Sequence, residues 1–174
     1  MDTVTVGIDL GGTNILAIVV DSDGRIRARK KTDTDQSQGM RGIAAQMRDV
    51  AEKALEESGV GWEQAGEVGV AVPTSVDPET GDALHAPNLG WKNEPARATF
   101  EEVFGRTVYL ENDVNCGILG EFEAGAAKGC QTAVGYFVGT GLGGGVIIDG
   151  RLRRGKRGVA GELGHEIVRY NGRR

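Results

Sequence analysis

The chain has 174 residues, near the top of the usual range of ~100–200 for one domain, and its 39% apolar and 26% charged residues are typical of a soluble globular protein. A formal net charge of −5 argues against a nucleic-acid partner bound through bulk positive charge, and no apolar run approaches the ~20 residues of a membrane span. The acidic start predicts no signal peptide, and the two cysteines, Cys116 and Cys130, favour reduced thiols in a cytoplasmic protein.

The first third of the chain predicts a three-stranded meander followed by a helix. Apolar and polar residues alternate over residues 4–10, which predicts a half-buried strand. After a glycine turn, residues 15–20 are nearly all apolar and predict a second strand buried on both faces, and residues 25–32 predict a third. The helix is predicted from apolar residues at helical spacing, with Gly59 to end it: Ile43, Met47, Val50 and Ala54.

Strands and helices are also expected over the rest of the chain. Phe100, Val103 and Phe104 give one of these helices an apolar face, and Pro95 suits its first turn. In chain order, the predicted elements are a strand at 68–72, a turn-rich loop at 73–91, a helix after Pro95, a strand at 107–110, a helix that Asp113 would cap, and strands at 133–138 and 146–148 around a glycine loop.

Two parts of the chain far apart in sequence carry similar patterns. Residues 10–13 (LGGT) and residues 142–145 (LGGG) each precede an apolar strand that ends in an aspartate and a second turn. The similarity predicts two related lobes that face one cleft. Coincidence in a chain with 29 glycines is the alternative.

The glycine turns are candidate phosphate-binding loops, because glycine lets several backbone N–H groups approach an anion closely. Tight hairpin turns are the structural alternative. Asp9 stands beside the first turn, where a carboxylate could face a partly hydrated Mg²⁺ ion. Residues 139–144 also fit the dinucleotide pattern G-x-G-x-x-G, but β-branched residues follow where that pattern requires a helix, which argues against NAD.

Two further segments carry candidate catalytic and binding side chains. Asp113, at the end of a predicted strand, could accept a proton from an attacking hydroxyl, with Asn112 bonding the same substrate; a plain helix cap is the alternative. Glu162 and His165 are three residues apart and would share one face of a helical turn, a pairing suited to a polyhydroxylated ligand; a surface turn is the alternative. With two histidines in the chain, a metal site built from histidines alone is excluded.

Together these segments resemble the ROK family (repressor, open reading frame, kinase), which lies within the actin-like sugar-kinase superfamily. The resemblance runs from Val6 to the last residue and rests on five motifs in order. They are residues 7–14 (GIDLGGTN), 87–91 (PNLGW), 111–115 (ENDVN), 139–145 (GTGLGGG) and 161–165 (GELGH).

The resemblance implies an α/β protein with the actin-like (ribonuclease H-like) sugar-kinase fold. Residues 1–113 would form a complete N-terminal lobe with the first phosphate loop and the sugar loop. Residues 114–174 would begin a C-terminal lobe with the second phosphate loop. The implied activity is ATP-dependent phosphorylation of a hexose, with glucose at its 6-hydroxyl as the expected acceptor, in a cytoplasmic protein that forms a homodimer at full length.

The resemblance also implies roles for individual residues. Asp113 would be the general base, and Asp9 would be oriented towards Mg²⁺. The sugar contacts would be Asn88, Asn112, Asp113, Glu162 and His165. The ATP phosphates would contact Gly11, Gly12, Thr13, Asn14, Thr140, Gly141, Gly143 and Gly144.

Two departures from the family pattern stand out. After Pro73, where members often carry Gly-Pro, this chain has Thr74 and Ser75. The family's zinc site pairs the histidine that matches His165 with three cysteines of a C-x-C-G-x-x-G-C run, which would begin just past Arg174. We therefore expect zinc only in a longer chain, and we expect the 174 residues alone to phosphorylate glucose poorly and to associate through apolar surface.

Other functions compete with the kinase. A sugar-sensing regulator of the same family would need a DNA-binding helix-turn-helix ahead of the strand that begins at Val4, and a non-catalytic sugar-binding fragment is a third possibility. The basic residues at 151–157 are either a solvated loop or an attraction for ATP or polyphosphate.

Overall fold

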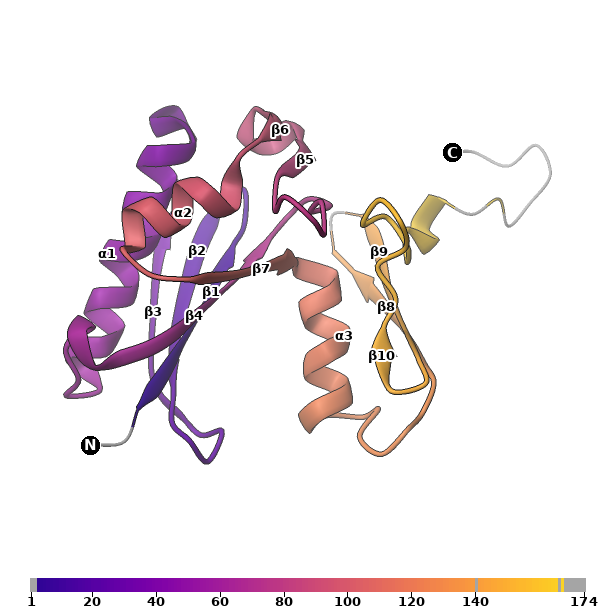
Figure 1. The fold of residues 1–174 in the computed structure, drawn as a ribbon, viewed down its shortest axis with the longest axis horizontal. Coiled ribbons are helices and arrows are strands. Elements are labelled where there is room, and N and C mark those ends of the chain that lie inside the picture. Colours follow the sequence, from indigo (N-terminus) through magenta and orange to yellow (C-terminus); the bar gives the residue numbers. More distant parts are fainter. Residues whose placement is uncertain (1–2, 140, 166, 168–174) are drawn as a thin grey trace. The chain divides into compact units, whose positions relative to one another are not determined.

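A computed structural model describes residues 3–139, 141–165 and 167 of the chain, which divides into two compact units, Met1–Asp113 and Val114–Arg174. Four short 3-10 helices accompany the main elements: η1 (Gln36–Gln38), η2 (Trp62–Gln64), η3 (Pro87–Leu89) and η4 (Leu163–His165). The strands and helices are β1 (Val4–Leu10), β2 (Asn14–Val20), β3 (Ile26–Asp33), α1 (Gly39–Glu57), β4 (Ala65–Val72), β5 (Ala83–Ala86), β6 (Trp91–Glu94), α2 (Ala96–Phe104), β7 (Val108–Asn112), α3 (Asp113–Ala124), β8 (Ala133–Val138), β9 (Leu142–Ile148) and β10 (Arg151–Leu152) (Figure 1).

The first unit is built on a five-stranded sheet with the order β3-β2-β1-β4-β7. Strands β1, β2 and β3 form the predicted antiparallel meander. Strand β4 then pairs with β1 in parallel, and β7 pairs with β4 in parallel. Each parallel pairing requires a crossover, and α1 and α2 supply these crossovers. The carboxyl ends of β1, β4 and β7 therefore lie at one edge of the sheet.

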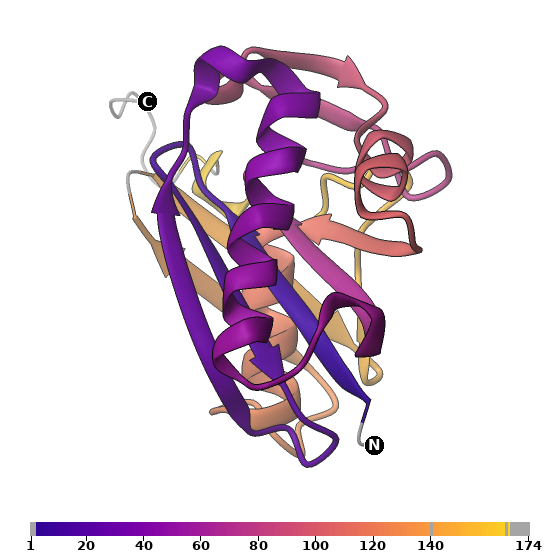
Figure 2. The ribbon, with the colours of Figure 1, turned by 90° about the vertical axis from the view of Figure 1, so that its left-hand side faces the viewer.

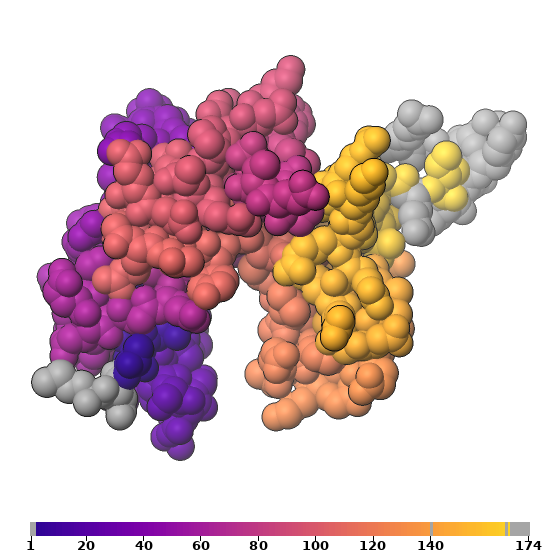
Figure 3. Space-filling view, viewed as in Figure 1, coloured from indigo at the N-terminus to yellow at the C-terminus, as the bar shows by residue number. Residues whose placement is uncertain are grey.

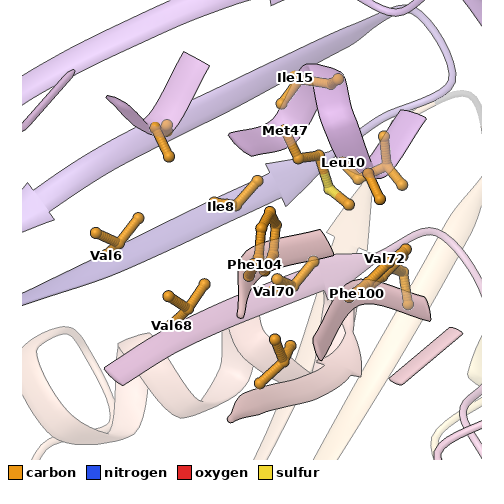
Figure 4. Close-up of a cluster of buried hydrophobic side chains, with 14 of the residues drawn as sticks. Val6, Ile8, Leu10, Ile15, Met47, Val68, Val70, Val72, Phe100 and Phe104 are labelled. Carbon is orange, nitrogen blue, oxygen red and sulfur yellow. The ribbon is translucent and has the colours of Figure 1, made fainter. Parts of the chain in front are cut away.

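Helices α1 and α2 cover one face of this sheet (Figure 2). The four apolar residues predicted for the inner face of the first helix are all buried in α1, as expected. Figure 4 shows Phe100 and Phe104 of α2 among the valines of β4 that face the helices. This single apolar cluster fixes which face of each strand points inward.

The second strand corrects one prediction. Residues 15–20 were expected to be buried on both faces, yet only alternate residues of β2 are buried, namely Ile15, Ala17 and Val19. Leu16 and Ile18 are half-buried because α1 and α2 both lie on the opposite face of the sheet. Strand β2 thus carries apolar residues on both faces, although the helices cover only one of them.

The segment predicted as a loop at 73–91 instead contains β5, which is the first strand of a β-hairpin. Strands β5 and β6 pair in antiparallel register, with Ala86 opposite Trp91 and η3 between them. Each strand has only four residues, too few for the alternation of apolar residues to be recognised. The hairpin and α2 form one continuous surface in the space-filling view (Figure 3), and Arg97 N–H donates to Gly81 O at 3.2 Å.

The second unit contains a three-stranded antiparallel sheet in the order β10-β9-β8, together with α3. The last predicted strand, residues 146–148, begins earlier, because β9 starts at Leu142. Among residues 3–139, 141–165 and 167, the structure has no helix long and apolar enough to cross a membrane.

The two hairpins correspond, but in a different register from the one the sequence indicated. Strands β2 and β9 each have seven residues and are each followed by an aspartate. Residues 11–13 precede β2, and the described glycines that precede β9 are Gly139 and Gly141. The sequence pattern instead matches residues 10–13 with residues 142–145. Residues 142–145 all lie inside β9. The repeated glycines made the wrong alignment look equivalent.

Arg106 ties the start of β4 to the end of α2. Its guanidinium carbon lies 4.5 Å from the centroid of the Trp62 ring, and Arg48 lies 4.9 Å from the same centroid. Its Nη atoms donate to the carbonyls of Trp62 (2.9 Å), Gly66 (3.0 Å) and Ala65. One side chain thus satisfies three backbone acceptors.

Replacement of Arg106 should therefore destabilise the first unit. We expect Arg106→Met to lower the free energy of unfolding by about 1–3 kcal/mol in urea denaturation, because three carbonyls lose a charged donor. Arg41→Met is the control, since the exposed Arg41–Glu102 pair is screened by water and should matter much less. Equal losses in the two variants would contradict this role for Arg106.

Candidate functional site

The carbonyl groups of the first glycine turn, residues 11–13, accept hydrogen bonds that hold the turn in place. Gly11 N–H donates to Asn14 O at 2.9 Å, which closes the turn. Thr34 donates from its hydroxyl to Gly11 O and from its N–H to Thr13 O, each at 2.9 Å, and Gln36 Nε2 donates to Gly12 O. The three carbonyls of the turn are thus each bonded within the protein, which fixes the orientation of its peptide groups.

Asp9 lies beside this turn on the sheet face opposite the helices. Its Cα is in register with Leu16 of β2 and Ala71 of β4. The residue retains exposed surface, but its neighbours partly withdraw the carboxylate from water, and this desolvation raises the pKa of Asp9 above its ordinary value. A bound cation would offset the cost of ionising the group there.

The same turn lies against one candidate sugar-binding residue. A Cβ built on Gly12 would stand 3.4 Å from the Cβ of Asn88, which belongs to η3. Gly90 ends η3 in a left-handed conformation, with φ of 70°. The first unit therefore brings a candidate phosphate contact and a candidate sugar contact together.

Asn112 and Asp113 meet where β7 ends and α3 begins. The Asn112 Nδ2 atom donates to Asp113 Oδ1 at 3.0 Å and to Thr74 O at 3.3 Å. Asn112 is in register with Val72, the last residue of β4. The candidate base is thus oriented by a neighbouring amide that is itself bonded to the segment after β4.

Sequence reasoning did not assign a role to Thr74, Thr34 or Gln36. Thr74 was noted only as a departure from the family pattern, yet it is 5% exposed and bonds Asn112 through its carbonyl. Thr34 and Gln36 follow β3 and support the first glycine turn. Each is a single polar residue outside the motifs, so the pattern of the sequence offers no signal for it.

The second glycine segment contains glycines of two kinds. Gly139 N–H donates to Gly141 O at 2.9 Å, and a Cβ on either residue would meet no atom within 4 Å. Neither residue has a left-handed φ. Packing among the described residues therefore does not explain these two glycines, and their close approach to a ligand stays a prediction. Thr140, between them, lies outside the described residues.

Packing does explain the glycines inside β9. A Cβ on Gly143 would stand 2.5 Å from Val114 Cγ2 of α3, and a Cβ on Gly144 would stand 2.6 Å from Gly161 O. The two glycines thus admit α3 on one face of β9 and the segment around Gly161 on the other. Any phosphate contact they make would come in addition to this structural role.

Glu162 and His165 lie on one short turn of the second unit, as predicted. His165 N–H donates to Glu162 O at 3.2 Å, and the side chains approach to 3.9 Å between Nε2 and Oε2. Both residues are exposed. The described part of the chain contains no group of three or more His, Cys, Asp or Glu residues that could hold a metal ion.

The candidate sugar contacts are divided between the units. Asn88, Asn112 and Asp113 belong to the first unit, whereas Glu162 and His165 belong to the second. That all five meet one sugar remains a prediction.

The comparisons with known proteins decide the family. The ROK family model matches residues 5–174. The chain belongs to the ROK family. The glucokinase of Thermotoga maritima is 39% identical over 168 residues, which cover 96% of this chain and 51% of that protein. The xylose repressor of Caldicellulosiruptor bescii is 32% identical over 165 residues, 95% of this chain and 41% of that protein.

The solved structures agree with this assignment. A ROK family glucokinase from Streptomyces griseus, in complex with glucose and AMPPNP, superposes with a TM-score of 0.83 at 39% identity, over 95% of this chain and 51% of that one. The fold is therefore that of the actin-like sugar kinases, as the motifs predicted. The chain spans about half the length of the curated relatives it matches.

Replacement by alanine should have opposite effects at the two kinds of glycine, on stability at Gly144 and on nucleotide binding at Gly141. Gly144→Ala should lower the free energy of unfolding by about 1–3 kcal/mol, because the added methyl group overlaps the backbone at Gly161. Gly141→Ala should leave thermal unfolding unchanged and weaken binding of a non-hydrolysable ATP analogue, measured by calorimetry. Unchanged nucleotide affinity in Gly141→Ala would contradict a nucleotide contact at Gly141.

Asp9 should be a residue whose replacement stabilises the fold. Desolvation raises its pKa above 3.8, so the ionised form is penalised in the folded state. This cost is absent at pH below 3.8, where Asp9 is protonated folded and unfolded, and it develops as pH rises through the raised pKa. Asp9→Asn should therefore unfold at a higher temperature than wild type at pH 7 and at the same temperature near pH 3.

The same comparison repeated with Mg²⁺ and an ATP analogue tests what Asp9 faces. The ion and nucleotide should raise the unfolding temperature of wild type more than that of Asp9→Asn. A variant that is less stable than wild type at pH 7 without ligand would contradict the desolvation argument.

Proposed function

We propose that this protein is an ATP-dependent hexose kinase that phosphorylates glucose at its 6-hydroxyl. The observation that carries the proposal is the Asn112–Asp113 pair, where an amide orients a carboxylate at the junction of β7 and α3. The similarity to glucokinases from Thermotoga maritima and Streptomyces griseus supports the same reaction. Catalysis of phosphoryl transfer rests on positioning and electrostatics, which this arrangement suits.

In the proposed reaction, Asp113 takes the proton of the attacking sugar hydroxyl. The hydroxyl oxygen forms a bond to the γ-phosphorus of ATP, and the bond from that phosphorus to the β,γ-bridging oxygen breaks. The products are the sugar phosphate, ADP and a proton held on Asp113. The 3.0 Å hydrogen bond from Asn112 keeps the carboxylate of Asp113 in a fixed orientation for this proton transfer.

The two turns would bind the polyphosphate. Residues 11–13 have their carbonyls bonded to Thr34 and Gln36, and Gly139 and Gly141 leave open space for a ligand. Asp9 suits a magnesium ion, because Mg²⁺ is held by one or two carboxylates, water and substrate phosphates. The ion would neutralise the charge that develops on the phosphates.

A sugar-binding regulator is the second candidate, favoured by the 32% identity to a xylose repressor. An ATP-coupled assay with a panel of hexoses separates the two functions. It should be run on the 174-residue chain and, where the reading frame continues past Arg174, on the longer product. Glucose-dependent formation of ADP supports the kinase; sugar binding without turnover in the longer product supports the regulator.

Asp113→Asn tests the general base. The change keeps the size and hydrogen bonding of the side chain but removes its basicity. We expect kcat to fall by at least ~10²-fold, with a much smaller change in glucose affinity. Glu123→Gln is the matched control, since Glu123 is an exposed carboxylate on the same helix. Turnover within tenfold of wild type in Asp113→Asn would remove Asp113 from this role.

A further inference from the structure

Thr74 stands out among the residues that the proposed reaction does not use. It lies two residues after β4, and it is 5% exposed although it carries a hydroxyl group. Its N–H donates to Val72 O at 2.9 Å, which turns the chain sharply after the strand. A buried hydroxyl is costly unless it is bonded, so its partners indicate what the residue does.

The hydroxyl of Thr74 bonds to β5. His85 N–H donates to Thr74 Oγ1 at 3.0 Å, and Thr74 Oγ1 in turn donates to Ser75 O at 3.4 Å. Strand β5 leads directly into η3, which carries Asn88. The hydroxyl therefore anchors the strand that delivers a candidate sugar contact.

The carbonyl of Thr74 bonds to the side chain of Asn112, next to the candidate base. It accepts from Asn112 Nδ2 at 3.3 Å, and the same nitrogen donates to Asp113 Oδ1 at 3.0 Å. These two bonds account for the two hydrogens of the amide, which fixes the orientation of the Asn112 side chain. Thr74 thus helps to orient Asn112 and, through it, Asp113.

One residue consequently links two parts of the candidate site that are distant in sequence. The loop between β4 and β5 has other anchors, since Leu84 N–H donates to Ser75 O at 3.0 Å and Asp77 N–H donates to Asp82 O at 2.9 Å. Neither of these bonds involves Asn112. Among the hydrogen bonds described for this loop, those of Thr74 alone bond both to β5 and to Asn112.

We propose that Thr74 is a positioning residue of the phosphoryl-acceptor site, which sets the distance between the sugar held by Asn88 and the base Asp113. This inference rests on the proposed hexose kinase activity. Loss of the hydroxyl would release β5 from Thr74 and let the sugar-binding turn shift relative to Asp113. A misplacement of about 1 Å in such a site can cost on the order of 10²-fold in rate.

Three variants test the proposal in the protein form that shows kinase activity. Thr74→Val keeps the shape and removes the hydroxyl, and Thr74→Ser keeps the hydroxyl. We expect Thr74→Val to lower kcat/KM for glucose by about 10- to 100-fold, with the KM for ATP unchanged, and Thr74→Ser to remain near wild type. Thr80→Val is the control, because it removes an exposed hydroxyl of the same loop that accepts from Asp82 N–H at 3.2 Å and bonds the Asp77 side chain, but bonds neither β5 nor Asn112 among the hydrogen bonds described for this loop.

Several outcomes would overturn the proposal. Wild-type kcat and KM for glucose in Thr74→Val would do so, as would an equal loss in Thr74→Ser or in Thr80→Val. A purely structural role would raise the KM for ATP and for glucose together. Where Thr74→Val does not fold, Thr74→Ala removes the hydroxyl without adding a second methyl group beside the His85 amide and is judged by the same criteria.

The test distinguishes failure of this inference from failure of the proposed function. Absence of turnover in the wild-type protein with every hexose counts against the kinase. Glucose affinity measured by calorimetry then decides for Thr74: weaker binding in Thr74→Val than in Thr74→Ser supports the positioning role, and equal binding overturns it. A wild-type protein that binds no hexose overturns both.

Discussion

The parallel pairing of β1, β4 and β7 is the constraint on which the candidate site depends. Asp9 is in register with Ala71, and Ala71 with Glu111, so the ends of the three strands lie side by side. The register is set by the valines and leucines that face the helices, because a shift of one residue would expose them. The polar residues at or just beyond the ends of these strands lie at one edge of the sheet as a consequence.

The site draws on this constraint in two ways. Asp9 comes from the end of β1 itself, where partial burial raises its pKa, at a place that we expect to suit a cation. Thr74 and Asn112 come from just beyond β4 and at the end of β7, where one hydrogen bond connects them. The register of these strands therefore determines both which residues form the apolar core and where the candidate site residues lie.

The glycines show how the same residue type serves different physical needs. In β9, Gly143 and Gly144 allow α3 and the segment at Gly161 to approach the strand from opposite sides. Among the described residues, a Cβ on Gly139 or Gly141 would meet no atom within 4 Å, so the predicted phosphate contact at these positions meets no competing packing role. A motif rich in glycine thus combines an internal packing surface with a candidate phosphate contact.

The sequence by itself determined the elements and motifs whose signals are local. The alternation at residues 4–10, the apolar face of α1 and the order of the five motifs were sufficient for the meander, the first helix and the family. Only the tertiary structure decided the β5–β6 hairpin, the one-sided burial of β2, the separate roles of the glycines and the position of Thr74. Each of these depends on a neighbour distant along the chain, and a distant partner leaves no periodic pattern in the residues that contact it.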